Sequence, residues 1–123
     1  MTAKQRATRT SDSVILDVLA YEVGFDDPRE AEGKIRRRLR NHGLGPYQQS
    51  RVDLLRRFKN EIQGEIHRNK RSRYYVGSHG VYAAMEDFDV ERLTQDLSAS
   101  YPDLPREEIA AFVPRAIYYY FLR

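Results

Sequence analysis

Four side chains in one short stretch of this sequence could carry out metal-dependent chemistry on phosphate esters. They are Asp26, Asp27, Glu32 and Lys34, residue types that metal-dependent nucleases use. That chemistry requires carboxylates held on a rigid frame around a metal ion. The run Asp27-Pro28-Arg29-Glu30, however, has the pattern of a helix start, with Asp at the N-cap, Pro at the first helical position and Glu completing a capping box. We therefore expect these carboxylates to cap a helix rather than to bind a metal.

The sequence contains no other catalytic signature. The three histidines, His42, His67 and His79, are far apart and lack metal-ligand spacing. The chain has no Cys, which excludes a thiol nucleophile, a disulfide framework and a Cys-based zinc site. It also has no P-loop and no Rossmann fingerprint. We expect a protein that is not an enzyme and that uses no cofactor.

Basic residues are concentrated in the middle of the chain. The net charge is only +3, but residues 34–73 contain thirteen basic and three acidic side chains, and the regions on either side are acidic overall. Ten of the thirteen are Arg, whose planar guanidinium suits phosphate oxygens and guanine edges. Such a cluster is typical of a nucleic-acid-binding protein. The alternative is a solvated Arg-rich surface, or one that the acidic ends of the chain fold back to neutralise.

The candidate nucleic-acid contacts form three groups. The first group follows the helix start at Asp27 and comprises Lys34, Arg36, Arg37, Arg38 and Arg40. The second extends the positive surface and comprises Arg56, Arg57, Arg68, Lys70, Arg71 and Arg73. The third is aromatic, Tyr74 and Tyr75 with Tyr82 nearby, because tyrosine rings can stack on unpaired bases. Half-buried packing is the alternative role for each ring.

Hydrophobic periodicity predicts the elements that position these groups. Helices are expected over residues 12–23, from Asp27 to Gly43, over 49–69, from Asp89 through Ser100, and from Pro105 onward, with Pro114 kinking or breaking the last one. β-prone runs on either side of residues 77–80 predict a short hairpin over 73–84. The expected fold is mainly α, with about five helices and one short β-hairpin, similar to a winged helix-turn-helix. Residues 11–123 should form one helical domain behind a flexible basic arm, residues 1–10.

Each expected helix has an apolar stripe that marks its buried face. The stripes are, in chain order, Val14, Ile15, Val18, Leu19 and Val23; Ala31, Ile35 and Leu39; Val52, Leu55, Phe58, Ile62 and Ile66; Val90, Leu93, Leu97 and Tyr101; and Ile109, Phe112, Val113, Ala116, Ile117 and Tyr120.

Residues 20–46 resemble the second helix-turn-helix of AraC-type regulators. Those proteins have Ala-x-x-x-Gly-Phe, a small polar pair and then a recognition helix that ends in basic residues. Here Ala20 to Pro28 match the turn, residues 35–39 match the basic ending, and residues 43–46 echo the Gly-x-x-Pro that follows. Ala31 replaces a common aromatic residue, residues 40–42 look like an insertion, and the family's other helix-turn-helix is absent. The resemblance implies a recognition helix that enters the major groove.

A second stretch is similar to small helical domains of the antitoxin type. Leu97, Tyr101-Pro102-x-Leu104, Ile109 and Ala116 follow the pattern in which a Tyr-Pro-x-Leu turn joins two helices. The resemblance implies DNA binding or association with a toxin. Because the motif lies in the acidic part of this chain, a packing or dimer role suits it better than phosphate contact.

The C-terminal residues 117–122 are the most apolar stretch of the chain. Three consecutive tyrosines cannot all face one core, so some of this surface should stay exposed. Tyr118, Tyr119, Tyr120 and Phe121 are therefore candidates for a homodimer contact, with core cover as the alternative.

The sequence as a whole predicts a non-enzymatic nucleic-acid-binding protein, most simply a small DNA-binding regulator or an antitoxin-like protein. DNA is favoured over RNA, and RNA would be indicated by a preference for single strands or loops together with a dependence on Tyr74 and Tyr75. The alternative is a protein-interaction or assembly module that docks an acidic partner or self-associates through its Tyr-rich C-terminus. Because the chain has no long apolar run and residues 1–10 lack the apolar stretch of a signal peptide, we expect a cytoplasmic protein without membrane contact.

Overall fold

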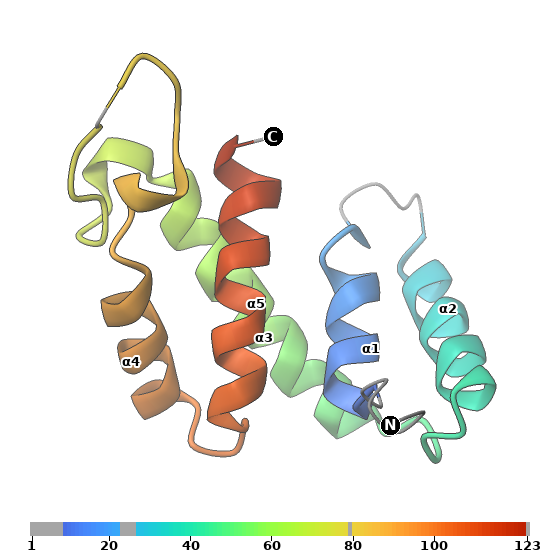
Figure 1. Ribbon diagram of the computed structural model, residues 1–123. Helices are drawn as coiled ribbons and strands as arrows, with labels where there is room; N and C mark the ends of the chain where they lie inside the picture. The colour runs from blue at the N-terminus through green and yellow to red at the C-terminus, as the bar shows by residue number, and fades with distance from the viewer. Residues whose placement is uncertain (1–8, 23–26, 79, 123) are drawn as a thin grey trace, which may run out of the picture. The chain divides into compact units, whose positions relative to one another are not determined.

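The computed structural model describes residues 9–22, 27–78 and 80–122. Five α-helices occupy most of these residues: Ser11–Leu19 (α1), Pro28–Asn41 (α2), Gln49–His67 (α3), Val90–Ser100 (α4) and Arg106–Ile117 (α5) (Figure 1). The prediction of a mainly α fold is confirmed. The chain divides into two compact units, Met1–Arg57 and Phe58–Arg123, which are described separately below. The single domain over residues 11–123 stays a prediction.

Two sequence predictions fall on residues outside the described ranges. Most of the basic arm, residues 1–8, is one of them, and the AraC-like turn at residues 23–26 is the other. Within the described ranges, no helix has both the length and the apolar content that crossing a membrane requires.

α1 begins with a capping box one residue earlier than the sequence suggested. Thr10 is the N-cap, and its hydroxyl accepts a hydrogen bond from the backbone N–H of Ser13 at 3.0 Å, while the Ser13 hydroxyl accepts from the N–H of Thr10 at 3.2 Å. The helix ends at Leu19, earlier than the predicted end at Val23. Its described apolar stripe is buried as predicted.

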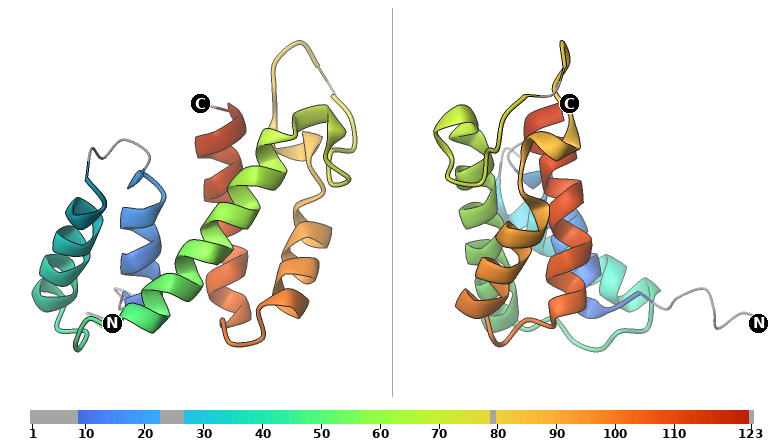
Figure 2. Two further views of the ribbon diagram at one scale, coloured as in Figure 1. Left: turned by 180° about the vertical axis from the view of Figure 1, so that it is seen from behind. Right: turned by 60° about the vertical axis from the view of Figure 1, so that its left-hand side comes forward.

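α2 begins as the sequence predicted. The Asp27 carboxylate accepts a hydrogen bond from the backbone N–H of Arg29 at 2.9 Å, and the Glu30 carboxylate accepts from the N–H of Asp27 at 3.4 Å. Its stripe, Ala31, Ile35 and Leu39, is fully buried. α1 and α2 pack side by side and run in opposite directions (Figures 1 and 2). The two helices therefore form a helical hairpin, whereas a helix-turn-helix crosses its helices steeply.

The first turns of α3 complete unit 1. Val52 and Leu55 are fully buried, and the stripe continues through Phe58, Ile62 and Ile66 into unit 2. Between α2 and α3, Gly43 adopts a left-handed φ of 65°, which ends α2 because glycine alone has no Cβ to clash there.

In unit 2, α4 and α5 pack against each other, and the Tyr-Pro-x-Leu turn joins them. The Asp89 side chain caps α4 as predicted, and Leu104 is buried in the turn with its N–H bonded to the carbonyl of Tyr101 at 3.0 Å. Pro114 does not break α5. The helix continues to Ile117 and passes directly into a π-helical segment, Tyr118–Leu122 (η5). Of the predicted kink or break, the break was wrong, and the kink stays a prediction.

The predicted β-hairpin over residues 73–84 was wrong, and with it the winged helix-turn-helix. The described residues contain no strand, only one isolated antiparallel bridge between Tyr75 and Phe88. Short 3₁₀ turns, Asn69–Arg71 (η3) and Met85–Asp87 (η4), flank the segment, and its middle is an exposed loop that projects from unit 2 (Figure 2). A two-stranded ribbon without a third strand is only marginally stable in water. The ring of Tyr75, which suggested a strand, packs on the ring of Phe88 instead. Such a residue can resemble a strand residue because β-propensity largely measures packing.

Candidate nucleic-acid interface

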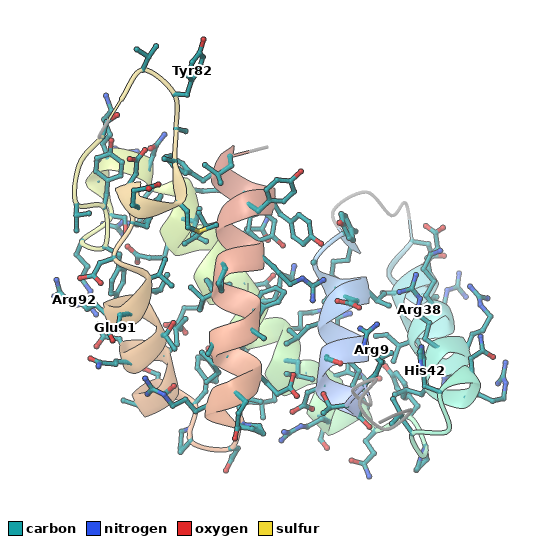
Figure 3. The ribbon with its side chains drawn as sticks, in the orientation of Figure 1. Arg9, Arg38, His42, Tyr82, Glu91 and Arg92 are labelled. Carbon is teal, nitrogen blue, oxygen red and sulfur yellow. The ribbon has the colours of Figure 1, made fainter. Side chains whose placement is uncertain are left out.

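The exposed side of α2 carries the first group of predicted contacts. The buried stripe at positions 31, 35 and 39 turns Arg37, Arg38 and Arg40 outward, and all three are exposed. Figure 3 labels Arg38 among them. Among the described residues, none of these three arginines has a hydrogen bond or an ion pair with another side chain. Lys34, on the same helix, is half-buried. The side of α2 formed by Arg37, Arg38 and Arg40 is called the outer face of α2 below.

Acidic residues near the N-terminus neutralise part of the basic cluster. Arg51 forms two hydrogen bonds with Asp12, at 2.9 and 2.7 Å, and the Arg56 side chain lies 3.0 Å from the carboxylate of Glu22. The hydrogen bond that Arg56 donates to Glu22 raises the pKa of Arg56, which therefore stays charged and paired. The alternative in which the acidic ends fold back on the basic residues is thus partly realised. Arg56 was predicted as a nucleic-acid contact, but in the structure its guanidinium forms an ion pair with Glu22.

Arg36 is held in a different way from its neighbours on α2. Its guanidinium carbon lies 4.1 Å from the centre of the Tyr47 ring, and its Nε donates a hydrogen bond to Glu32 at 2.8 Å. Burial raises the pKa of Tyr47, and the negative charge of Glu32 raises it further, so the phenol stays neutral at physiological pH. Beside this ring lies an open groove of about 480 Å³, lined by Tyr47, Glu32, Gln49, Arg29, Glu22 and Arg56.

The remaining basic residues that were predicted as nucleic-acid contacts lie in α3 or directly after it. Arg57 is exposed at the end of unit 1. In unit 2, Lys70 and Arg71 are exposed on the short turn after α3 and have no ion pair with a described residue. Arg68 lies 4.0 Å from Glu65, and Arg73 lies 3.5 Å from Asp96. Four basic side chains therefore follow one another directly after α3, but two of them have an acidic neighbour.

Tyr74 cannot stack on a base as the sequence suggested. It is only 4% exposed, and its hydroxyl donates a hydrogen bond to Asp96 at 2.6 Å and accepts one from Arg73 at 2.9 Å. Burial raises the pKa of this phenol, with the hydrogen bond to Asp96 adding to the shift. Tyr75 is half-buried and packs edge-to-face on Phe88 at 5.7 Å. Packing is therefore the observed role of both rings.

Tyr82 differs from the other two tyrosines of this segment. It is 84% exposed and lies at the tip of the loop that projects from unit 2 (Figure 3). Val81, beside it, is also exposed.

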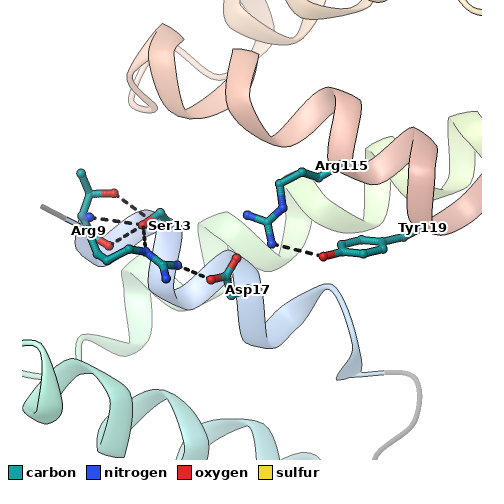
Figure 4. A network of polar contacts seen from close by, with 6 residues as sticks. Arg9, Ser13, Asp17, Arg115 and Tyr119 are labelled. Carbon is teal, nitrogen blue, oxygen red and sulfur yellow. Dashed lines mark hydrogen bonds and ion pairs between the residues drawn. The ribbon is translucent and has the colours of Figure 1, made fainter. Parts of the chain in front are cut away.

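The predicted interface residues at the C-terminus are only partly exposed. Tyr118 is 53% exposed, whereas Tyr119, Tyr120 and Phe121 are half-buried. The Tyr119 hydroxyl accepts a hydrogen bond from Arg115 at 3.4 Å (Figure 4). Phe121 packs edge-to-face on Phe88, with ring centres 4.8 Å apart. Only Tyr118 of this group presents most of its ring to solvent.

At the start of α1, Arg9 contributes a separate cluster. Its guanidinium forms an ion pair with Asp17 and a hydrogen bond with the hydroxyl of Ser13 (Figure 4). This arginine is therefore used within unit 1 rather than for a ligand.

Sequence reasoning overlooked Tyr47 and Gln49. Tyr47 lies in the turn after α2, which was interpreted only as an interruption between helices, and Gln49 was predicted only as the start of the next helix. An aromatic residue directly after a basic helix was the available signal, because such residues often accompany nucleic-acid-binding arginines.

The carboxylates of the nuclease-like stretch show no metal-binding arrangement. Within the described ranges, no three His, Asp or Glu side chains are grouped so that they could hold a metal ion. Asp27 is used as a helix cap and Glu32 pairs with Arg36, while Asp26 lies outside those ranges.

Comparison with protein-family models, with curated proteins and with solved structures gave no match.

Proposed function

We propose that this protein binds nucleic acid, with DNA as the favoured partner, through the outer face of α2, and that it catalyses no reaction. The observation that carries the proposal is that Arg37, Arg38 and Arg40 are exposed on one helix and have no ion pair with a described residue. Binding a phosphate there breaks no internal salt bridge. Guanidinium groups also match phosphate oxygens in both charge and geometry.

The fold supports this assignment by holding the arginines on a rigid element. The capping box at Asp27 and the buried stripe of α2 fix the helix in place. Arg57 is exposed in the same unit and adds a further positive charge there. A small DNA-binding regulator is the simplest protein of this kind.

Fluorescence anisotropy with a labelled mixed-sequence duplex and a single strand, at two salt concentrations, tests the proposal. We expect binding that weakens steeply as salt rises, because each phosphate contact releases counterions. Reversing all three arginines (Arg37→Glu, Arg38→Glu, Arg40→Glu) should abolish binding while leaving the helical circular-dichroism spectrum intact.

The matched control is a charge reversal at an exposed arginine elsewhere. Arg38→Glu alone should weaken binding, whereas Arg106→Glu should not, although both change the net charge equally. Arg106 lies in the first turn of α5, where an acidic side chain suits the helix dipole. Equal effects of the two single variants would contradict the site assignment.

A protein-interaction role is the second candidate, and the exposed ring of Tyr118 is the observation that favours it. In that case the protein would self-associate without binding nucleic acid. Sedimentation velocity over a range of concentrations would show the association, and Tyr118→Ser should abolish it.

A further inference from the structure

The guanidinium of Arg36 is held over the ring of Tyr47 before any ligand binds. Its guanidinium carbon lies 4.1 Å from the centre of the Tyr47 ring, within the range of a cation–π contact. Its Nε donates a hydrogen bond to Glu32 at 2.8 Å. An N–H of a guanidinium lies in the plane of the group, so this bond does not occupy the face of the guanidinium. The side chain is still 52% exposed.

The ring beneath Arg36 is fixed as well. The Tyr47 hydroxyl donates a hydrogen bond to Oε1 of Gln49 at 2.9 Å, and Nε2 of Gln49 donates to Asp53 at 2.8 Å. Asp53 and Gln49 lie one turn apart on α3, so the helix sets the position of the ring. Tyr47 and Arg36 are therefore held in place from α3 and α2.

A planar cation held in this way differs from a phosphate ligand. An arginine that binds phosphate directs its N–H groups at the oxygens, whereas Arg36 already gives Nε to Glu32. Its remaining property is a flat, weakly hydrated surface, and guanidinium planes stack on nucleic-acid bases. Because the stack is formed in advance, little rotamer freedom is lost when a base binds.

The groove beside Tyr47 provides the space that such a base needs. Its volume of about 480 Å³ is within the size range of small-ligand pockets. Its charged lining residues are two arginines and two glutamates, so the groove has no net charge and suits an uncharged base beside the Tyr47 ring better than a phosphate. A base in a duplex already has stacked neighbours on both faces, so only an unpaired base can enter.

We propose that Arg36 and Tyr47 form a stacking platform for an unpaired nucleic-acid base, while the outer face of α2 holds the adjoining phosphates. The site therefore selects single strands, or bases outside a helix, over a closed duplex. This inference rests on the proposed nucleic-acid binding and specifies its substrate class.

A tryptophan placed at position 47 provides a direct readout. The chain has no Trp, so Tyr47→Trp introduces a single indole whose fluorescence reports on stacking. Titration with a single-stranded oligonucleotide should quench it. A strand of the same length with abasic sites in place of bases keeps the phosphates and should cause no quenching.

Affinities of otherwise native variants separate stacking from charge. We expect the native protein to bind the base-containing strand about tenfold more tightly than the abasic strand, the difference typical of one base stack. Tyr47→Ala and Arg36→Lys should each remove this preference. Arg38→Lys, which keeps a charge at a phosphate-contacting position, should retain it. Circular dichroism checks that each variant is folded. If Tyr47→Trp does not fold, Tyr47→Phe keeps an aromatic ring at this position and should keep the preference for the base-containing strand.

The possible outcomes distinguish this inference from the proposed function. Equal binding of both strands by the native protein, with no quenching of Tyr47→Trp, would overturn the platform and leave nucleic-acid binding intact. Failure of the native protein to bind any strand or duplex would overturn both.

Discussion

Arg51 and Asp12 face each other through two hydrogen bonds, from Nε to Oδ1 at 2.9 Å and from Nη2 to Oδ2 at 2.7 Å. The pair joins the first turn of α3 to the first turn of α1, across 39 residues of sequence. Asp12 is only 7% exposed, and the guanidinium of Arg51 compensates for the burial of its carboxylate. The pair is a main polar link within unit 1.

Removing this partner should destabilise the protein. Arg51→Ala leaves the Asp12 carboxylate buried without its guanidinium, and we expect a loss of about 2 kcal/mol in the free energy of unfolding. Urea denaturation followed by circular dichroism measures the loss. Arg29→Ala is the control, because its pair with Asp27 is exposed and should contribute much less to stability than the buried pair. Equal losses would contradict the difference in burial.

Asp27 should make the stability of α2 depend on acidic pH. Hydrogen bonds from the side chain and then the backbone N–H of Arg29 lower the pKa of Asp27. Its stabilising effect is therefore complete above the ordinary Asp pKa of about 3.9 and is lost as the pH falls through the lowered value. The melting temperature of Asp27→Asn, which keeps a capping side chain, should approach that of the native protein as the solution is acidified below that range. A constant difference would contradict the prediction.

Two glycines should respond in opposite directions to the same substitution. Gly43 has a left-handed φ of 65°, whereas Gly33 lies inside α2, and a Cβ at either position would meet no atom within 4 Å. Gly43→Ala should cost about 1 kcal/mol because of its backbone conformation. Gly33→Ala should stabilise by about 0.5–1 kcal/mol because alanine favours the helix. Thermal melts of both variants test the contrast, and a shared sign would refute it.

Tyr74 should affect stability and not nucleic-acid affinity. Tyr74→Phe removes the hydroxyl between Asp96 and Arg73 and should cost about 1 kcal/mol. Because burial raises the pKa of Tyr74, its contribution is complete below the ordinary Tyr pKa of about 10 and is lost as the pH rises through the raised value. Melting curves at neutral and alkaline pH should show the native protein losing its advantage over Tyr74→Phe. A weaker affinity for single strands in Tyr74→Ala, with the fold intact, would instead revive the stacking role.

The helices were predictable because their signals are local. The capping box at Asp27 and the stripe through Ala31, Ile35 and Leu39 lie within a few turns of one another, and the structure has both as expected. The interior of α3 was equally clear from Val52 to Ile66. A periodic stripe and a capping residue need no knowledge of tertiary contacts.

The site could be predicted only in part because pairing depends on distant residues. Arg56 and Arg37 have the same side chain, and only the approach of Glu22 distinguishes the paired residue from the exposed one. Tyr74 was likewise predicted as a strand residue, because the sequence does not show that its hydroxyl bonds to Asp96, 22 residues later. The predicted hairpin was wrong for the same reason, because the ring of Tyr75 packs on Phe88 rather than across two strands.

The most closely packed helices are neighbours in the sequence, α1 with α2 and α4 with α5. Only short loops have to close before these contacts form, so the entropic barrier to folding is small. The chain should therefore fold on the microsecond-to-millisecond timescale of small helical proteins. Each helical pair can assemble as soon as its second helix has formed, which limits the time during which the apolar stripes are exposed to aggregation.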